Sequence, residues 1–313
     1  PRRGLMHMFG LEYLDKKIDI SDLGFLERSD SIGGRYTLMY MKSSGMKRFR
    51  SWQSMSTLTN WVNGDGRNIK TGIFSRNSLT FKNLNEVRGH LYYFPRRWED
   101  LESRGNGSFR THDRVFWELA FGTDTSQKFS WSVQGGGMQE SLSGRTQFMG
   151  VGMTYKPTDR FSLDLDANYR QHRGWLLHQG GRQMATFDAG NWQPRLAMDV
   201  FLTARQQIRL TMQWAGIVAD EQAFYQIPIV PGALIEVDKD VDAAIGDFTM
   251  SRLTAQLRYR WEIAPLSDLF VVYTRGSNLD NRVDDEFGNL LTDAFSDPVI
   301  DVLVVKLRYR FGN

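Results

Sequence analysis

The stretch Ile300–Phe311, near the end of the chain, alternates between apolar and polar residues over much of its length. Because a β-strand sends successive side chains to opposite faces, one face of this strand is apolar and aromatic and the other is basic. The apolar face holds Leu303, Val305, Leu307, Tyr309 and Phe311, and the basic face holds Lys306, Arg308 and Arg310. A strand of a water-soluble sandwich seldom has so basic a polar face. The pattern is typical of a membrane barrel, in which the apolar face meets lipid and the charges point into a wet lumen.

A second stretch repeats this pattern. In Leu253–Trp261 every second residue is apolar or aromatic, and the residues between them are polar or basic. The basic residues on this strand are Arg252, Arg258 and Arg260. Both stretches end in Leu-Arg-Tyr-Arg followed by an aromatic residue, which predicts two strands that lie close together in one wall.

The composition at first resembles that of a water-soluble protein. Charged residues make up 24% of the 313 residues, and the mean hydropathy is −0.43. The wall of a membrane barrel can have an equally low mean hydropathy, because its apolar residues occupy only every second position. The longest apolar runs, Val302–Val305 and Phe270–Tyr273, are far shorter than the ~20 residues of a spanning helix. Any membrane span must therefore be made of strands.

Two further features of the composition bear on location and partners. Cysteine is absent, which suits an oxidising compartment such as the periplasm. The net charge of +3 is too balanced to indicate a nucleic-acid partner.

Alternating segments and turn signals predict fourteen strands. The turns include Asn63-Gly64-Asp65-Gly66, a strong hairpin signal. The expected strands are 4–15, 32–41, 47–61, 69–81, 87–94, 114–121, 128–138, 147–155, 161–170, 184–202, 208–214, 248–261, 269–274 and 300–311. Gly190 and Pro194 are expected to break the strand 184–202, which would then either bulge or begin later. The segments 95–111, 220–247 and 276–298 are expected to be long loops.

The connections between these strands fall into two classes. Those after even-numbered strands are short, and most of those after odd-numbered strands are longer. Outer-membrane barrels have short periplasmic turns, long external loops and both termini in the periplasm. The prediction is an all-β protein in which residues 1–313 form one closed antiparallel transmembrane β-barrel of about 14 strands in the bacterial outer membrane.

Three blocks of the sequence resemble a family of bacterial outer-membrane barrel proteins of unknown function. The blocks are Ser21–Asp30, Leu257–Tyr273 and Val305–Phe311. Members of this family usually carry a carbohydrate-binding-module-like β-sandwich before the barrel, so the resemblance implies an N-terminal periplasmic domain outside this sequence. It implies no catalytic residues. The final strand also resembles the signal that the outer-membrane assembly machinery recognises, which implies that machinery as a partner.

The inward faces of the predicted strands carry charges of both signs. The expected basic ring of the lumen is Arg209, Arg252, Arg258, Arg260, Lys306, Arg308 and Arg310. The expected acidic residues of the lumen are Glu118, Asp164, Asp166 and Asp199. A basic wall opposite an acidic one would favour anionic or polyhydroxylated solutes. The alternative is that these charges pair across the lumen and only hold the shape of the barrel.

Other residues are expected to have simpler roles. Tyr259, Trp261, Tyr309 and Phe311 are expected to form an aromatic girdle at the membrane boundary. The histidines show no metal-binding spacing, although His172 and His178 lie near a predicted external loop. The acidic stretches 238–242 and 280–286 lack the spacing of a calcium-binding loop. The sequence therefore predicts no metal, no cofactor and no catalytic residues.

The leading functional prediction is a pore or uptake channel for small hydrophilic solutes, with anions and saccharides as the candidate classes. The alternative is a plugged anchor or scaffold that holds a periplasmic domain or an envelope protein complex. A membrane hydrolase is a third reading that no motif supports. The expected partners are outer-membrane lipids, lipopolysaccharide and the assembly machinery, with other envelope proteins as possible partners.

Overall fold

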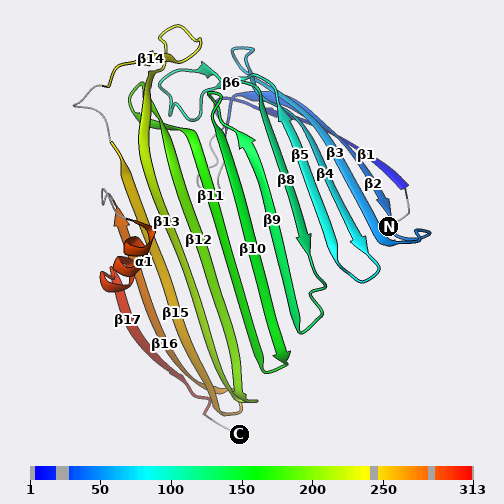
Figure 1. Cartoon of the computed structure of the whole chain (residues 1–313), viewed down its shortest axis with the longest axis vertical. Coiled ribbons are helices and arrows are strands. Elements are labelled where there is room, and N and C mark those ends of the chain that lie inside the picture. The colour runs from blue at the N-terminus through cyan, green and yellow to red at the C-terminus, as the bar shows by residue number, and fades with distance from the viewer. Residues whose placement is uncertain (1–3, 19–27, 240–245, 281–285, 312–313) are drawn as a thin grey trace.

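The computed structural model describes residues 4–18, 28–239, 246–280 and 286–311. In these residues the protein is all-β apart from one helix, α1 (Phe287–Ser296). Fourteen strands follow one another in chain order, each paired antiparallel with the next, and β14 adds a fifteenth strand beside β13 (Figure 1). Two short strands, β6 and β7, form a separate sheet between β5 and β8.

The strands of the main sheet have the following bounds: β1 Gly4–Leu14, β2 Ser31–Lys42, β3 Phe49–Asn63, β4 Asn68–Phe81, β5 Glu86–Phe94, β8 Arg114–Gly122, β9 Phe129–Gln139, β10 Arg145–Thr158, β11 Phe161–Gly180, β12 Gln183–Thr203, β13 Gln206–Gln226, β14 Ile235–Val237, β15 Phe248–Ala264, β16 Ser267–Asp280 and β17 Ile300–Arg308. The small sheet consists of β6 Trp98–Glu99 and β7 Phe109–Arg110.

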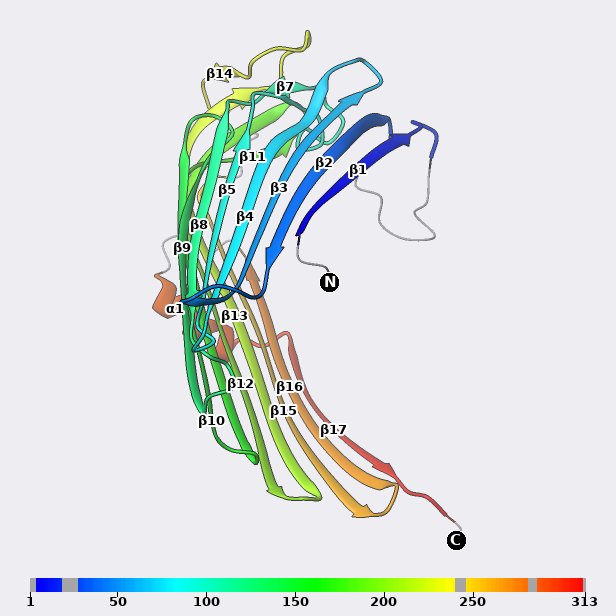
Figure 2. The same ribbon diagram turned by 90° about the vertical axis from the view of Figure 1, so that its right-hand side faces the viewer.

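The main sheet is open, so the prediction of a closed barrel is wrong. The sheet begins at β1 and ends at β17, and no ladder joins these two strands in the described residues. Figure 2 shows a strongly curved sheet with β1 near its upper end and β17 near its lower end. Strand length rises from nine residues in β5 and β8 to 21 in β12 and β13. Closure depends on the tilt and stagger of all the strands together, which the alternation within each strand does not encode.

The two faces of the curved sheet differ in polarity. On the convex face, exposed apolar side chains continue from one edge strand to the other. They include Leu5, Phe9 and Leu11 of β1, Leu58, Ile73, Leu91, Leu119, Val133, Met149, Leu165 and Leu257 of the strands between, and Leu303, Val305 and Leu307 of β17. The concave face carries most of the charged strand residues. The sheet is therefore amphipathic across its whole width.

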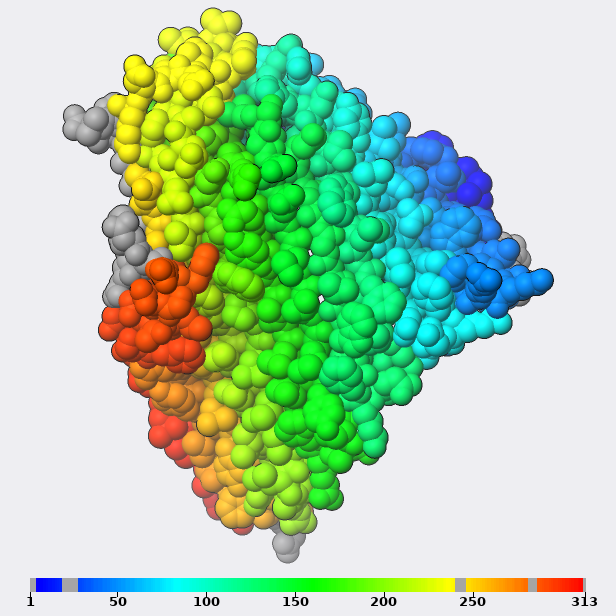
Figure 3. Space-filling model, in the orientation of Figure 1, coloured from blue at the N-terminus to red at the C-terminus, as the bar shows by residue number. Residues whose placement is uncertain are grey.

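Helix α1 lies over β13, β15 and β16 (Figures 1 and 3), on the convex side of the sheet (Figure 2). Leu290 and Ala294 are buried against Trp214 and Leu253 of the sheet. The Oγ of Ser251 accepts a hydrogen bond from Trp214 Nε1 at 2.9 Å and donates one to the Leu290 carbonyl at 2.8 Å. These contacts fix the helix to one place on the sheet.

The segment 276–298 was expected to be a loop, and that expectation is wrong in two ways. Strand β16 continues to Asp280, and α1 occupies most of the rest of the described segment. Phe287, Leu290, Leu291 and Ala294 have the i, i+3, i+4, i+7 spacing of an amphipathic helix. The N-cap residue, Glu286, makes no capping hydrogen bond with its side chain, so the usual start signal is missing. Within the described residues, no helix has both the length and the apolar composition needed to span a membrane.

The concave face changes character along its length. Near the upper end, Ala185, Phe187, Ala189 and Ala219 form a buried apolar cluster, which Trp175 and Phe248 among other residues pack against. On β13, β15, β16 and β17, the charged residues of the concave face gather at the lower end of the sheet. They lie beside the two-residue turns that follow β12 and β15.

Strand β12 runs through both of its predicted breaking points. Pro194 lies opposite Ala167 of β11, and the register stays constant on either side of it. The register with β13 shifts instead between Thr186 and Phe187 and between Phe201 and Thr203. Because β12 begins at Gln183, both expectations, a bulge at Gly190 and Pro194 or a later start, are wrong.

Candidate functional site

The strand registers place ten of the eleven predicted lumen residues on the concave face, and the eleventh, Arg310, lies beyond the end of β17. On the late strands, Arg209 lies opposite both Asp199 and Arg258. Directly paired residues of an antiparallel sheet point to the same side. Arg260 lies in one row with Phe270 and Lys306. Glu118 lies opposite Gly136, and this row continues through Phe148 to Arg170 on the same face.

Four of the predicted basic residues converge on one pocket near the lower end of this face. The pocket has a volume of about 360 Å³ and is lined by Gln207, Arg209, Arg258, Arg260, Asp268, Phe270 and Arg308, which we call the arginine pocket. These residues come from four consecutive strands, β13, β15, β16 and β17. They meet because β15 carries Arg258 and Arg260 two positions apart on one face, and the neighbouring strands add polar residues in the same rows.

Asp268 is the buried anchor of the arginine pocket. Its side chain is 2% exposed and accepts hydrogen bonds from Arg260 Nε at 3.0 Å and from Arg308 Nη2. Burial favours the protonated acid, but the hydrogen bonds and charges of Arg260 and Arg308 outweigh it and hold the pKa of Asp268 below its usual value. Asp268 follows directly after the β15–β16 turn, at the end of the sheet. It therefore fixes two guanidinium groups at the rim of the pocket.

Asp199 plays a similar but weaker part beside the pocket. Arg209 donates to Asp199 Oδ2 from Nη2 at 2.6 Å and from Nε at 3.1 Å, and Gln207 Nε2 donates to Asp199 Oδ1 at 2.7 Å. The side chain of Arg209 is 50% exposed, so solvent weakens this ion pair. The pair orients the Arg209 guanidinium without neutralising the pocket.

Arg258 differs from its three neighbours. Its Nη2 donates to Gln256 Oε1 at 3.2 Å, and among the residues that the structure describes it has no carboxylate partner. Four guanidinium groups thus face two carboxylates, which leaves an excess charge of +2. Arg258 lies between Arg209 and Arg260, where an incoming anion would reach several guanidinium groups at once.

The other predicted lumen residues lie outside the arginine pocket. The Glu118 carboxylate is 3.5 Å from His90 Nδ1, and Asp164 accepts hydrogen bonds from Thr154 at 2.6 Å and Ser162 at 3.2 Å. Asp166 lies opposite Arg195 in the ladder. Arg252 and Lys306 share the concave face, Arg310 lies beyond the end of β17, and none of the three lines the pocket. Of the predicted girdle residues, Trp261 is 38% exposed, Tyr309 50% and Phe311 87%, and Tyr259 is partly exposed.

Sequence reasoning missed three lining residues, Gln207, Asp268 and Phe270. Asp268 belongs to the Leu257–Tyr273 block and begins a strand directly after a predicted turn. Its importance depends on the pairing with Arg308, which is 40 residues away in the chain. The sequence did contain one signal for Asp268: it is a carboxylate at the same end of the predicted sheet as the basic residues of the late strands.

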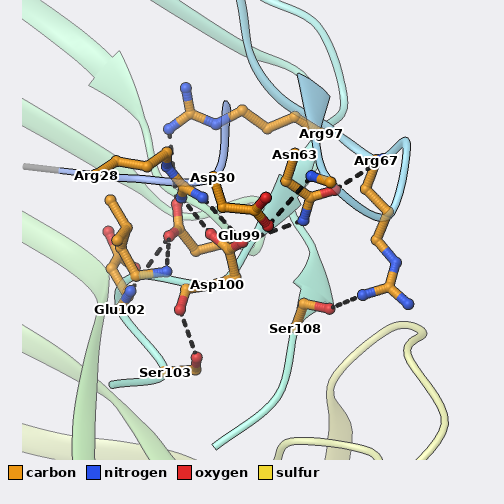
Figure 4. Close-up of polar contacts among 12 residues, drawn as sticks. Arg28, Asp30, Asn63, Arg67, Arg97, Glu99, Asp100, Glu102, Ser103 and Ser108 are labelled. Atoms are coloured by element: carbon orange, nitrogen blue, oxygen red, sulfur yellow. Dashed lines mark hydrogen bonds and ion pairs between the residues drawn. The ribbon is translucent and has the colours of Figure 1, made fainter. Parts of the chain in front are cut away.

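A second polar cluster lies at the upper end, in the 95–113 loop (Figure 4). Arg28, from the segment before β2, forms two hydrogen bonds with the Asp100 carboxylate, which also accepts one from Asn63 Nδ2 at 3.4 Å. In the β3–β4 turn, the backbone N–H of Gly64 donates to Asp30 at 3.2 Å. This network ties the 95–113 loop to the early strands, and its groups bond mainly to one another.

Replacing Asp100 by Asn should destabilise the protein by roughly 1.5–3 kcal/mol, because hydrogen bonds to a charged group are lost where both side chains are about four-fifths buried. Asp65→Asn is the control, since the Asp65 side chain is 67% exposed and its pair with Arg67 contributes less than about 1 kcal/mol. Equilibrium denaturation would measure both variants. Equal losses would show that the Arg28–Asp100 pair has no special role.

The two histidines near the upper loops contact protein groups. His172 is buried, with Nδ1 2.8 Å from Thr146 Oγ1 and 3.5 Å from the Glu140 carboxylate, and it stacks on Trp175. His178 Nε2 lies 2.8 Å from the Gly181 carbonyl oxygen. Within the described ranges, no three acidic or histidine side chains are grouped as metal ligands. Most of the two acidic stretches, at 240–242 and 281–285, lies outside the described residues.

Comparison with known proteins identifies a family. Residues 5–311 match the model of a family described as a domain of unknown function, DUF5916. No curated protein matches the chain. Because the matched residues include nearly the whole sequence, the chain belongs to the DUF5916 family.

Proposed function

We propose that this protein is an envelope protein of the bacterial outer membrane that binds small anionic solutes in its arginine pocket. The observation that carries the proposal is the convergence of Arg209, Arg258, Arg260 and Arg308 on one concavity of about 360 Å³. A guanidinium presents its N–H groups in a planar fork that matches carboxylate and phosphate oxygens. The excess charge of +2 gives the pocket a preference for anions over neutral solutes.

The convex face supports the membrane location. Soluble proteins rarely expose a continuous apolar surface as extensive as the one that runs from β1 to β17. Lipid would cover this surface, while the charges of the concave face would remain in water. Because unpaired backbone groups are not tolerated in hydrocarbon, the free edges of β1 and β17 would face water or protein. The β15–β16 turn and Asp268 would lie outside the hydrocarbon layer, beside the aromatic residues Trp261 and Tyr309.

The test is a calorimetric titration of the folded protein in detergent with sulfate. Arg258→Gln should weaken sulfate binding about tenfold, or roughly 1.4 kcal/mol, because the guanidinium without a carboxylate partner is lost. Arg252→Gln is the matched control. It lies on the same strand and the same face but outside the arginine pocket, and it removes the same charge.

The two variants separate a specific site from a general charge effect. Equal weakening by Arg258→Gln and Arg252→Gln would mean that sulfate responds only to the net charge of the face. No sulfate binding by the wild-type protein would make the arginine pocket an internal ion-pair cluster. The anchor or scaffold function would then be the better proposal.

A further inference from the structure

A second basic concavity lies at the opposite end of the strands from the arginine pocket. It has a volume of about 440 Å³ and is lined by Arg96, Trp98, Arg110, Thr111, His112, Pro231, Gly232 and Ala233, which we call the upper pocket. Its residues come from two loops, the 95–113 loop and the loop that follows β13. This volume falls within the range of roughly 300–1,000 Å³ that is usual for small-molecule sites.

Backbone contacts join the two loops and fix the shape of the upper pocket. The Arg110 N–H donates to the Gly232 carbonyl at 2.9 Å, and the Thr111 N–H donates to the Arg97 carbonyl at 2.9 Å. Phe109, next to the pocket, is fully buried in one cluster with Met184 and Ile227. The network of Figure 4 holds the other side of the same loop to the early strands. The lining is therefore positioned before any ligand arrives.

The guanidinium of Arg110 is held by stacking on an aromatic ring, and its side chain makes no hydrogen bond to the residues that the structure describes. It lies over the ring of Trp98 at 4.8 Å from the ring centroid. Arg67 also lies over this ring, at 5.3 Å, and its Nη1 donates to Ser108 Oγ at 2.9 Å. Stacking uses the face of a guanidinium, whereas anions bind to its N–H edge. Arg110 is thus oriented without being neutralised.

Among the other lining residues of the upper pocket, Arg96 adds a second positive charge. Within the described part of the chain, neither Arg96 nor Arg110 forms a side-chain ion pair, and no carboxylate lines the pocket. Asp113 accepts the backbone N–H of Arg96 at 2.5 Å. His112 bonds to Ser143 Oγ through Nδ1 at 2.5 Å, which leaves Nε2 for a ligand.

We propose that the upper pocket binds a phosphoryl group carried by a saccharide or a lipid headgroup. Two guanidinium groups and an imidazole match the charge and the acceptor oxygens of a phosphate monoester. The remaining volume and the aromatic edge of Trp98 accommodate the group that carries the phosphate. This site is independent of the arginine pocket, because the two share no residue.

The test uses the full chain with Arg258→Gln as background, so that the arginine pocket contributes little. Glucose 1-phosphate is the soluble probe, and binding is measured by calorimetry and by the change in tryptophan fluorescence. Adding Arg96→Gln and Arg110→Gln should weaken binding at least tenfold and abolish the fluorescence change, while the unfolding temperature stays unchanged. Arg104→Gln is the control, because Arg104 is an exposed arginine of the same loop that does not line the pocket.

Lipid vesicles distinguish the two sources of the phosphoryl group. Phosphatidic acid in phosphatidylcholine vesicles presents the phosphate on a lipid, and pure phosphatidylcholine vesicles are the control. Loss of either glucose 1-phosphate or phosphatidic acid binding in the Arg96→Gln/Arg110→Gln variant supports the site and names its source. The proposal is overturned if both probes still bind after these substitutions. It is also overturned if neither probe binds the protein. Neither result bears on sulfate binding by the arginine pocket.

Discussion

Asp268→Asn should lower the unfolding temperature by several degrees and, at the same time, tighten sulfate binding several-fold. The substitution removes a buried carboxylate that accepts hydrogen bonds from Arg260 and Arg308. Both guanidinium groups then lose their partner, which destabilises the lower end of β16 and β17. The excess charge of the arginine pocket also rises by one, which favours a bound anion. Thermal unfolding and sulfate titration of the same preparation measure the two effects.

Asp199→Asn is the control for this prediction. Asp199 also bonds to an arginine, but its side chain is 24% exposed, against 2% for Asp268, and it bonds to one arginine where Asp268 bonds to two. Its loss should therefore cost less stability than the loss of Asp268. A larger fall in unfolding temperature for Asp199→Asn, or weaker sulfate binding for Asp268→Asn, would contradict the part assigned to Asp268.

The same carboxylate predicts how stability depends on pH. The two arginines hold the pKa of Asp268 below the ordinary carboxyl value of about 3.9, so folding favours the ionised form. Its contribution to stability is fully present above that ordinary value and is lost as the pH falls through the lower folded-state pKa. The difference in unfolding temperature between the wild type and Asp268→Asn should therefore shrink below about pH 4. A difference that grows in this acidic range would contradict the assignment.

Leu290→Ala should destabilise the protein by about 2–5 kcal/mol, the usual cost of truncating a fully buried leucine. Leu290 is 1% exposed and joins α1 to Trp214 and Leu253 on the convex face. Asn289→Ala, at an exposed position of the same helix, should change stability by less than about 0.5 kcal/mol. Equilibrium denaturation checks both values. A loss below about 1 kcal/mol for Leu290→Ala would show that α1 is not firmly docked.

The sequence predicts which side chains share one face of the sheet, because alternation within a strand is a local property. Alternation with a period of two places Arg258 and Arg260 on one face and Leu257 and Tyr259 on the other, whatever the neighbouring strands do. The rows of paired residues then extend the same division across the sheet. For this reason, ten of the eleven charged residues singled out in the sequence lie on the concave face, all except Arg310, which follows the end of β17.

Closure and the detailed site depend on relationships that no single segment contains. Whether β1 meets β17 depends on the summed tilt, twist and stagger of the strands between them. The arginine pocket requires that Asp268 lies opposite Arg308, a pairing between residues that are 40 positions apart in the chain. Helix α1 itself was missed because its ten residues lack a capping side chain and lie in a segment that was expected to be a loop.

The most direct test of the central claim is to locate a bound anion. Crystals of the protein soaked in selenate, a heavier analogue of sulfate, would reveal the anion by its anomalous scattering. The predicted result is a peak within the arginine pocket, in contact with Arg258 and at least one neighbouring guanidinium, that disappears in Arg258→Gln. A pocket without a peak at a selenate concentration that saturates binding in solution would contradict the account.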